Sequence, residues 1–116
     1  MADVTLYHNP RCSKSRRALE LMRAGGVEPQ IVEYLKTPLD RDGLVELLRA
    51  LQMPARDLLR RGEDEYSELG LADRLDDEEA LVDVLAEHPI LMERPIAVRG
   101  TRARLGRPPE RVLELL

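Results

Sequence analysis

The single cysteine of this chain, Cys12, stands among residues that favour its deprotonated, reactive form. It directly precedes a segment with helical spacing of apolar residues, which predicts that the thiol lies at a helix N-terminus. Free N–H groups and the helix dipole stabilise an anion there. Four cationic side chains flank it within five positions, namely Arg11, Lys14, Arg16 and Arg17. A free cysteine with a pKa of about 8.5 is only ~3% thiolate at neutral pH, whereas such surroundings lower the pKa to roughly 3.5–7.5.

The absence of a second cysteine limits the redox chemistry that Cys12 can perform. Ser15 occupies the position at which a Cys-x-x-Cys motif would carry its second sulfur. Any disulfide of Cys12 is therefore intermolecular, and a redox cycle needs an outside thiol such as glutathione or another protein. A lone cysteine is often a small buried apolar residue. Here the flanking residues are charged or polar, which favours the reactive thiol.

The elements that must position Cys12 can be read from the N-terminal third of the chain. Val4–Tyr7 has strand-forming residues, and Asn9-Pro10 is a turn signal. The spacing of apolar residues predicts a helix over 13–24, which Gly25-Gly26 ends. A second strand is expected within 29–35. Because a helix connects the two strands, they should be parallel with a right-handed crossover.

A helical segment of about residues 40–88 is expected to follow. Asp40 is a candidate N-cap for the first of its helices, and Asp76 is a candidate N-cap for the last. The predicted pieces span 41–51, 54–59, 63–69 and 77–87.

The C-terminal part of the chain predicts a hairpin and a last helix. Ile96 and Val98 alternate before the turn at Gly100-Thr101, and Pro109 opens a helix through Leu115. The order β-α-β, helical insert, β-β-α is that of a thioredoxin-like domain. We therefore predict an α/β fold with a mixed four-stranded sheet, as one domain over 1–116 with the insert at about 40–88. In such folds a proline before the hairpin approaches the cysteine in the cis form, and Pro95 stands at that place.

Length, composition and charge exclude several function classes. The chain of 116 residues suits one domain, and its net charge of −4 argues against general nucleic-acid binding. Neither a signal peptide nor a membrane-spanning run is apparent. One unpaired thiol suits a reducing cytoplasm, and we expect a cytoplasmic monomer without membrane contact. No Cys/His cluster predicts a metal site. The phosphatase loop Cys-x5-Arg is also absent, because Ala18 occupies the arginine position.

Several motifs together resemble the glutaredoxin-coupled arsenate reductase family. They run in the family's order over essentially the whole chain: Tyr7-His8-Asn9-Pro10-Arg11-Cys12-Ser13-Lys14-Ser15-Arg16, Tyr34-Leu35-Lys36-Thr37-Pro38, Leu59-Arg60, His88-Pro89-Ile90-Leu91-Met92-Glu93-Arg94-Pro95-Ile96 and Gly106-Arg107-Pro108. Well-known reductases of the family carry Cys-Gly-Thr-Ser at the cysteine. With Cys12-Ser13-Lys14-Ser15, this chain is more similar to an arsenate-reductase-like branch.

The resemblance implies a reaction and a set of site residues. Cys12 would be the nucleophile that attacks arsenate, and Arg60, Arg94 and Arg107 would bind the oxyanion. His8 would tune the thiol, with Ser15 and Pro95 in support. Glutathione would act as co-substrate, with no bound cofactor, and glutaredoxin would be the protein partner. Arginine suits this task because its planar fork binds oxyanions bidentately and neutralises their charge.

Two other functions are compatible with the same residues. The first is a thiol-disulfide or glutathionylation reductase with another substrate, which needs Cys12 but not all three arginines. The second is a non-enzymatic binding module that resembles the Spx type and contacts RNA polymerase. The Cys-x-x-Cys of that group is absent here.

Overall fold

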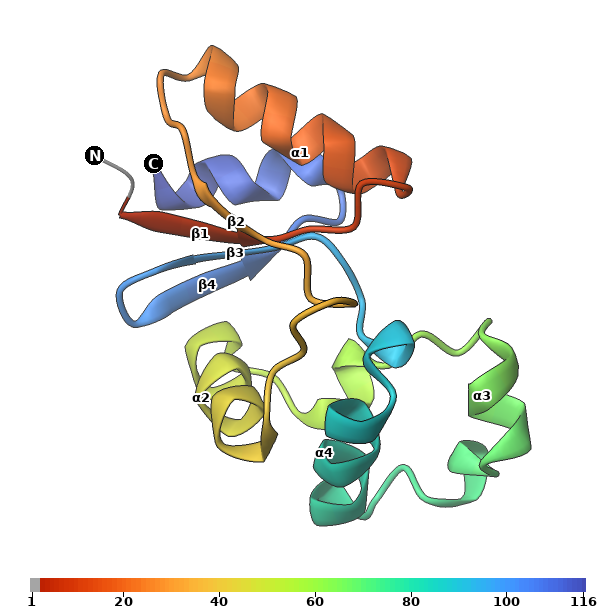
Figure 1. Ribbon diagram of the computed structural model, residues 1–116. Helices are drawn as coiled ribbons and strands as arrows, with labels where there is room; N and C mark the ends of the chain where they lie inside the picture. Colours follow the sequence, from red (N-terminus) through yellow and green to blue (C-terminus); the bar gives the residue numbers. More distant parts are fainter. Residues whose placement is uncertain (1–2) are drawn as a thin grey trace. The chain divides into compact units, whose positions relative to one another are not determined.

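The fold is built on a four-stranded mixed sheet, seen in a computed structural model that describes residues 3–116. The strand order is β2-β1-β3-β4 (Figure 1). The central strand β1 (Val4–Tyr7) pairs in parallel with β2 (Gln30–Val32) and antiparallel with β3 (Ile96–Arg99). A hairpin joins β3 to β4 (Arg102–Leu105). The predicted α/β fold with a thioredoxin-like β-α-β and β-β-α core is confirmed.

One face of this sheet carries the hydrophobic core that holds β1 in place. Helix α1 (Ser13–Ala24) and the 3-10 helix η4 (Pro109–Leu115) both cover this face (Figure 1). The predicted helix over 13–24 is confirmed. The predicted C-terminal helix from Pro109 to Leu115 is also present, but it is of the tighter 3-10 type. The core of this region consists of Val4, Leu6, Ala18, Met22, Ala97, Val112 and Leu115. Burial of these side chains fixes the end of β1, and with it the loop that carries Cys12.

Strand β2 is shorter than the predicted 29–35. Pro29 has no N–H to donate to the sheet, and the chain turns directly after Val32. In this turn the N–H groups of Lys36 and Thr37 both donate to the carbonyl oxygen of Glu33, at 2.9 and 3.1 Å. Local hydrogen bonds therefore replace the sheet pairing that the apolar residues of the segment suggest.

The helical part of the chain forms a compact unit of its own, residues 38–93, while residues 1–37 and 94–116 form the other. The single-domain interpretation stays a prediction. The helical unit consists of α2 (Arg41–Leu51), η1 (Ala55–Leu58), α3 (Asp64–Glu68), η2 (Leu71–Asp73), α4 (Glu78–Glu87) and η3 (Pro89–Leu91). Within it, Arg41 of α2 forms ion pairs with Glu79 and Asp83 of α4.

The two predicted caps of this unit have different outcomes. The Asp40 side chain accepts a hydrogen bond from the N–H of Gly43 at 2.8 Å and caps α2, as predicted. The prediction of Asp76 as the cap of the last helix is wrong. Asp77 accepts from the N–H of Ala80 at 3.1 Å, because α4 begins at Glu78 and a cap must directly precede the first helical residue.

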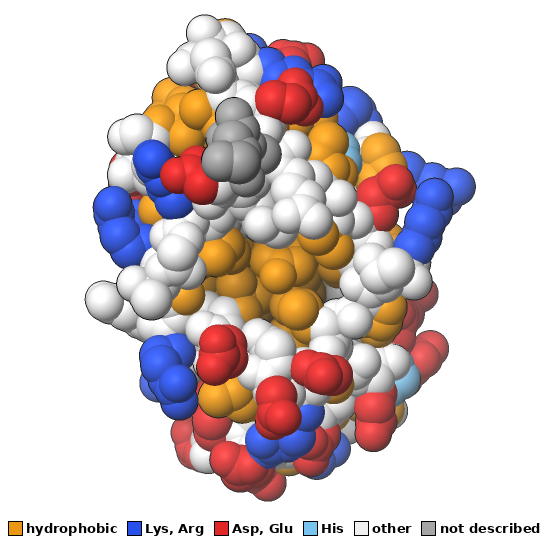
Figure 2. Space-filling model, turned by 60° about the vertical axis from the view of Figure 1, so that its left-hand side comes forward, with side chains coloured by type: hydrophobic (Ala, Val, Ile, Leu, Met, Phe, Trp, Pro, Cys, Tyr) orange, Lys and Arg blue, Asp and Glu red, His pale blue; other side chains and the backbone are white. Residues whose placement is uncertain are grey.

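Charged side chains of both signs are exposed. On the face drawn in Figure 2, both acidic and basic side chains occur around exposed apolar atoms. Among residues 3–116, no helix combines the length and the apolar character that crossing a membrane requires.

Candidate active site

Cys12 is the N-cap residue of α1, as the sequence predicts, with an extended backbone (φ −94°, ψ 123°). Its N–H donates to the carbonyl oxygen of Asn9 at 3.0 Å, which closes the loop after β1. Its own carbonyl accepts from the N–H of Arg16 at 3.0 Å and starts the helical hydrogen bonds. The thiol is partly exposed. The loop thus holds a sulfur atom at the N-terminal end of a helix, within reach of solvent.

The surroundings of the thiol favour the thiolate. Burial acts to raise the pKa of Cys12, but neighbouring polar groups outweigh it and the pKa lies below its ordinary value. These groups are the backbone N–H groups of Ser15 and Lys14 and the side chain of Arg94, whose positive charge adds to the effect. These are the free N–H groups of a helix N-terminus, used here to stabilise a negative charge.

A buried polar network lies directly behind the cysteine. His8, Asn9 and Ser15 are each at most 6% exposed. The hydroxyl oxygen of Ser15 lies 2.6 Å from Nδ1 of His8 and accepts from the N–H of Asn9 at 3.1 Å. Burial lowers the pKa of His8, an effect that Glu33 opposes and the nearby arginines reinforce. Nδ1 of a neutral His8 can accept a hydrogen bond from the Ser15 hydroxyl. Ser15 thus connects His8 to the helix turn that holds the sulfur.

Two residues after β4, Gly106 and Arg107, form hydrogen bonds with the backbone of the two residues before β3, Arg94 and Pro95. The N–H of Gly106 donates to the carbonyl oxygen of Pro95 at 2.8 Å, and Nε of Arg107 donates to the carbonyl oxygen of Arg94 at 2.9 Å. The Arg94-Pro95 bond is cis, as predicted, and so is the Arg107-Pro108 bond. Arg107 therefore contacts the backbone of Arg94, the residue whose guanidinium lowers the pKa of Cys12.

Arg60 belongs to the helical unit and lies between two carboxylates. Its Nε donates to Glu63 at 3.1 Å, and one of its terminal nitrogens donates to Glu93 at 2.9 Å. All three side chains are about a quarter exposed. The other predicted site residues, His8, Cys12, Ser15, Arg94, Pro95 and Arg107, lie in the unit that contains the sheet.

Comparison with known proteins identifies the family. The sequence matches the ArsC family over residues 7–115. The chain belongs to the ArsC family. It is 54% identical to the uncharacterized protein YfgD of Escherichia coli, over 98% of this chain and 97% of that protein. It is also 47% identical to an arsenate reductase of E. coli, over 100% of this chain and 82% of the relative. A solved arsenate reductase from Vibrio cholerae has a TM-score of 0.93 at 46% identity, with 97% of each chain covered.

The structure of this ArsC protein corrects one part of the sequence reasoning about the thiol. The cations that flank Cys12 are largely engaged elsewhere, since Arg16 donates to the carbonyl oxygen of Pro10 at 2.9 Å and Arg17 pairs with Glu20 at 3.2 Å. The cation that lowers the pKa of Cys12 is instead Arg94, which is remote in sequence. Only the fold, through the pairing of β1 with β3, brings Arg94 to the thiol.

Sequence reasoning also missed the contribution of Asn9. Its backbone contacts both Cys12 and Ser15, and its side chain accepts from the N–H of Arg11 at 3.0 Å. The signal was the Asn9-Pro10 turn, since asparagine commonly bonds the backbone two residues on. Within the described residues of this ArsC protein, no group of three or more His, Cys, Asp and Glu is placed to hold a metal ion.

Proposed function

We propose that this protein is an enzyme that reduces arsenate to arsenite, with Cys12 as the nucleophile and glutathione and glutaredoxin as electron donors. The observation that carries the proposal is the Cys12 thiol at the N-cap of α1, where the backbone N–H groups of Ser15 and Lys14 and the Arg94 guanidinium lower its pKa. Membership of the ArsC family and the similarity to proteins named arsenate reductase support the choice of substrate.

The first step is a substitution at arsenic. The Cys12 thiolate attacks the arsenic atom, a sulfur–arsenic bond forms, and one arsenic–oxygen bond breaks, with the oxygen leaving as water after protonation. Arsenic remains pentavalent in this step. The guanidinium of Arg94 neutralises the oxyanion as it approaches the thiolate, and its hydrogen bonds strengthen as charge develops on the oxygens.

The second step is the reduction. A glutathione thiolate attacks the Cys12 sulfur, and the electron pair of the sulfur–arsenic bond passes to arsenic, which leaves as trivalent arsenite. The two sulfurs are oxidised to a mixed disulfide. Glutaredoxin then takes the glutathione moiety by thiol exchange and returns Cys12 to the thiolate. A further glutathione regenerates glutaredoxin, so that the balance is arsenate and two glutathione molecules giving arsenite, glutathione disulfide and water.

The arginines would have different roles in this reaction. Arg94 acts on the nucleophile itself, because its guanidinium lowers the pKa of Cys12. Arg107 holds the carbonyl of Arg94 and would both place that arginine and bind an arsenate oxygen. Arg60 would bind the anion in exchange for one of its two carboxylate partners, Glu63 or Glu93. The hydrogen bonds from Arg60 to the bound anion would then replace the ion pair that Arg60 loses.

A coupled assay of arsenate reduction with glutathione and glutaredoxin tests the proposal. The wild-type protein should turn over arsenate, Cys12→Ser should abolish turnover, and Arg94→Ala should lower it by about 10²–10³-fold, as for the loss of one preorganised donor. Arg49→Ala, which changes an exposed arginine of α2, serves as the control and should retain full activity. Arsenate turnover that persists in Cys12→Ser would refute the assignment.

The contacts of Arg60 favour one alternative function. Two carboxylates already pair with its guanidinium, so Arg60 is not available to bind an oxyanion while these ion pairs last. Thiol exchange at Cys12 does not need Arg60 as an anion ligand. The protein would then be a thiol-disulfide or glutathionylation reductase with another substrate. In that case a glutathione mixed disulfide on Cys12 is cycled by glutaredoxin while arsenate is left unreduced. A cytoplasmic, monomeric protein stays our prediction under both functions.

A further inference from the structure

A cavity of about 280 Å³ adjoins the loop that carries Cys12. The loop of residues 8–11 after β1 forms one wall, and Glu33, Leu35 and Lys36 of the turn after β2 form the other. The N–H of His8 donates to the carbonyl oxygen of Val32 at 2.9 Å and joins the two segments at the base. The cavity thus lies at the carboxyl ends of two parallel strands, where α/β sheets commonly bind ligands.

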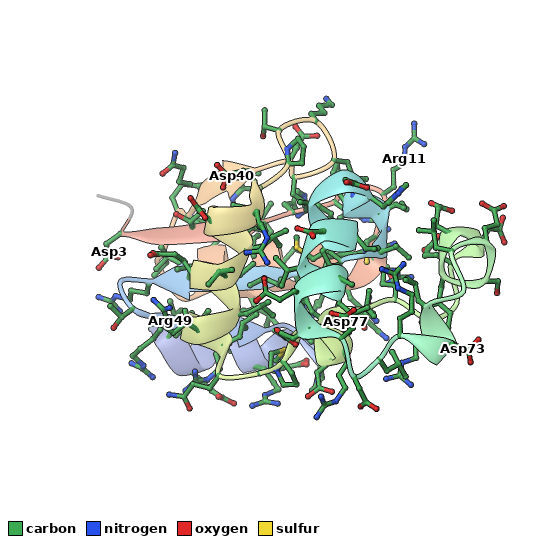
Figure 3. The ribbon with its side chains drawn as sticks, turned by 90° about the horizontal axis from the view of Figure 1, so that it is seen from below. Asp3, Arg11, Asp40, Arg49, Asp73 and Asp77 are labelled. Carbon is green, nitrogen blue, oxygen red and sulfur yellow. The ribbon has the colours of Figure 1, made fainter. Side chains whose placement is uncertain are left out.

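Charges of both signs line this cavity. Glu33 supplies a carboxylate, and Lys36 lies 3.5 Å from it with a side chain that is 76% exposed. Arg11 supplies a second cation, and its side chain extends away from the ribbon (Figure 3). Among residues 3–116, no carboxylate pairs with the Arg11 guanidinium, although the Arg11 backbone is fixed by its bond to Asn9. Leu35 adds an apolar contact that is 39% exposed.

We propose that this cavity is the binding subsite for glutathione, a proposal that rests on the function proposed above. Glutathione carries two carboxylates and one ammonium group, which match the cations Arg11 and Lys36 and the carboxylate Glu33. The volume approaches the roughly 300–1,000 Å³ of small-molecule sites, so an oxyanion alone would leave most of it empty. Because Arg11 of the cavity wall directly precedes Cys12, a peptide held here would lie next to the segment that carries the reactive sulfur.

Binding of a non-reactive analogue tests the subsite without any turnover. S-methylglutathione, titrated calorimetrically into the wild-type protein, should bind. Arg11→Ala and Lys36→Ala should each weaken binding roughly two- to five-fold, as expected for exposed charge pairs. Arg49→Ala is the matched control and should bind as the wild type does. Equal affinity of all four proteins would overturn the subsite.

A second measurement separates binding from an effect on the thiol. Cys12 thiolate attacks glutathione disulfide, which gives the mixed disulfide on Cys12 and one glutathione thiolate, and no arsenate is needed. Arg11→Ala should slow this reaction but leave the rate with the uncharged bis(2-hydroxyethyl) disulfide unchanged. Equal slowing with both disulfides would place the effect on the sulfur and refute the subsite. Because arsenate is absent, failure of arsenate reduction leaves this test intact.

Discussion

At the scale of single residues, the reactivity of Cys12 depends on groups that arrive from two directions. The backbone N–H groups of Ser15 and Lys14 come with the helix that follows the cysteine. The guanidinium of Arg94 comes from the segment before β3. A helix N-terminus alone accounts for only a modest stabilisation of an anion, about 0.3–1 kcal/mol at an exposed site. The Arg94 guanidinium adds a full positive charge to this effect.

Removal of the Arg94 guanidinium tests this assignment. Arg94→Ala takes away a donor and a positive charge that stabilise the thiolate, so the pKa of Cys12 rises toward its ordinary value. We expect the pH profile of iodoacetamide alkylation to move to higher pH and the rate at neutral pH to fall several-fold. Arg17→Ala removes an exposed cation that pairs with Glu20 and should leave the profile in place. Identical shifts in both variants would contradict a specific role of Arg94.

The residue scale also shows what the sequence can predict about the site. The nucleophile and its helix N-terminus follow from Cys12 and the spacing after it, because both are local. The contacts of Arg94 and Arg107 depend on strand pairing between distant segments and have no local signal. The ion pair of Arg60 with Glu93 is of the same kind, since Glu93 lies far from Arg60 in sequence, whereas Glu63 is only three residues away.

At the scale of the elements, the caps of the helical unit allow a sharp comparison. Asp77 caps α4 by accepting from the N–H of Ala80, whereas the adjacent Asp76 is exposed and has no cap bond. Asp77→Ala should lower the free energy of unfolding by about 1 kcal/mol. Asp76→Ala should change it by no more than about 0.5 kcal/mol. Urea unfolding of both variants measures the difference, and a larger loss in Asp76→Ala would restore the sequence-based assignment.

A tight contact links β4 to the segment before β3. A Cβ atom at Gly106 would lie 2.7 Å from Cγ of Pro95 and 3.1 Å from a methyl carbon of Val112. Gly106→Ala should therefore displace Pro95 and Arg94 and cost about 1–3 kcal/mol of stability, together with a slower alkylation of Cys12. Gly62→Ala, where no atom lies within 4 Å, is the control and should be neutral. Thermal unfolding and the rate of Cys12 alkylation are the measurements. Wild-type values of both for Gly106→Ala would show that a methyl group fits beside Pro95 without displacing it.

The elements themselves were largely predictable, because their signals are local. Helix α1 has periodic apolar residues and a terminal Gly25, and α2 has Asp40 as its cap. The errors occurred where neighbouring residues compete for one role. Asp76 and Asp77 are both good caps, and the geometry of the helix start chooses between them. The segment 33–37 has strand-forming residues, yet local backbone bonds turn it.

At the scale of the whole molecule, stability rests on aliphatic side chains, since Phe and Trp are absent from the sequence. Leu6 is fully buried at the centre of the sheet core. Leu6→Ala should lower the free energy of unfolding by about 2–5 kcal/mol, through lost burial and the cavity that it leaves. Ile31→Ala, on the edge strand β2 with 38% exposure, should cost much less. Equal losses in urea unfolding would contradict the core described above.

The overall order of elements was predictable from the sequence because each β-α-β or hairpin unit has few possible topologies. The division into two compact units agrees with the change from strand to helix patterns near residues 38 and 93. The cavity beside the Cys12 loop could not be foreseen. It requires the 8–11 loop and the 33–36 turn to stand side by side, which only the parallel pairing of β1 and β2 brings about.

The buried Ser15 occupies the position at which a second sulfur would be, and this affects how long a donor thiol stays bound to Cys12. A mixed disulfide of Cys12 with a donor thiol has no second cysteine in the chain to resolve it, so the donor stays attached until an outside thiol exchanges it. Protein that is acid-quenched within cells before this exchange and weighed intact by mass spectrometry will carry the attached donor as added mass. The identity of the natural donor can therefore be read from the protein itself, before any substrate is tested.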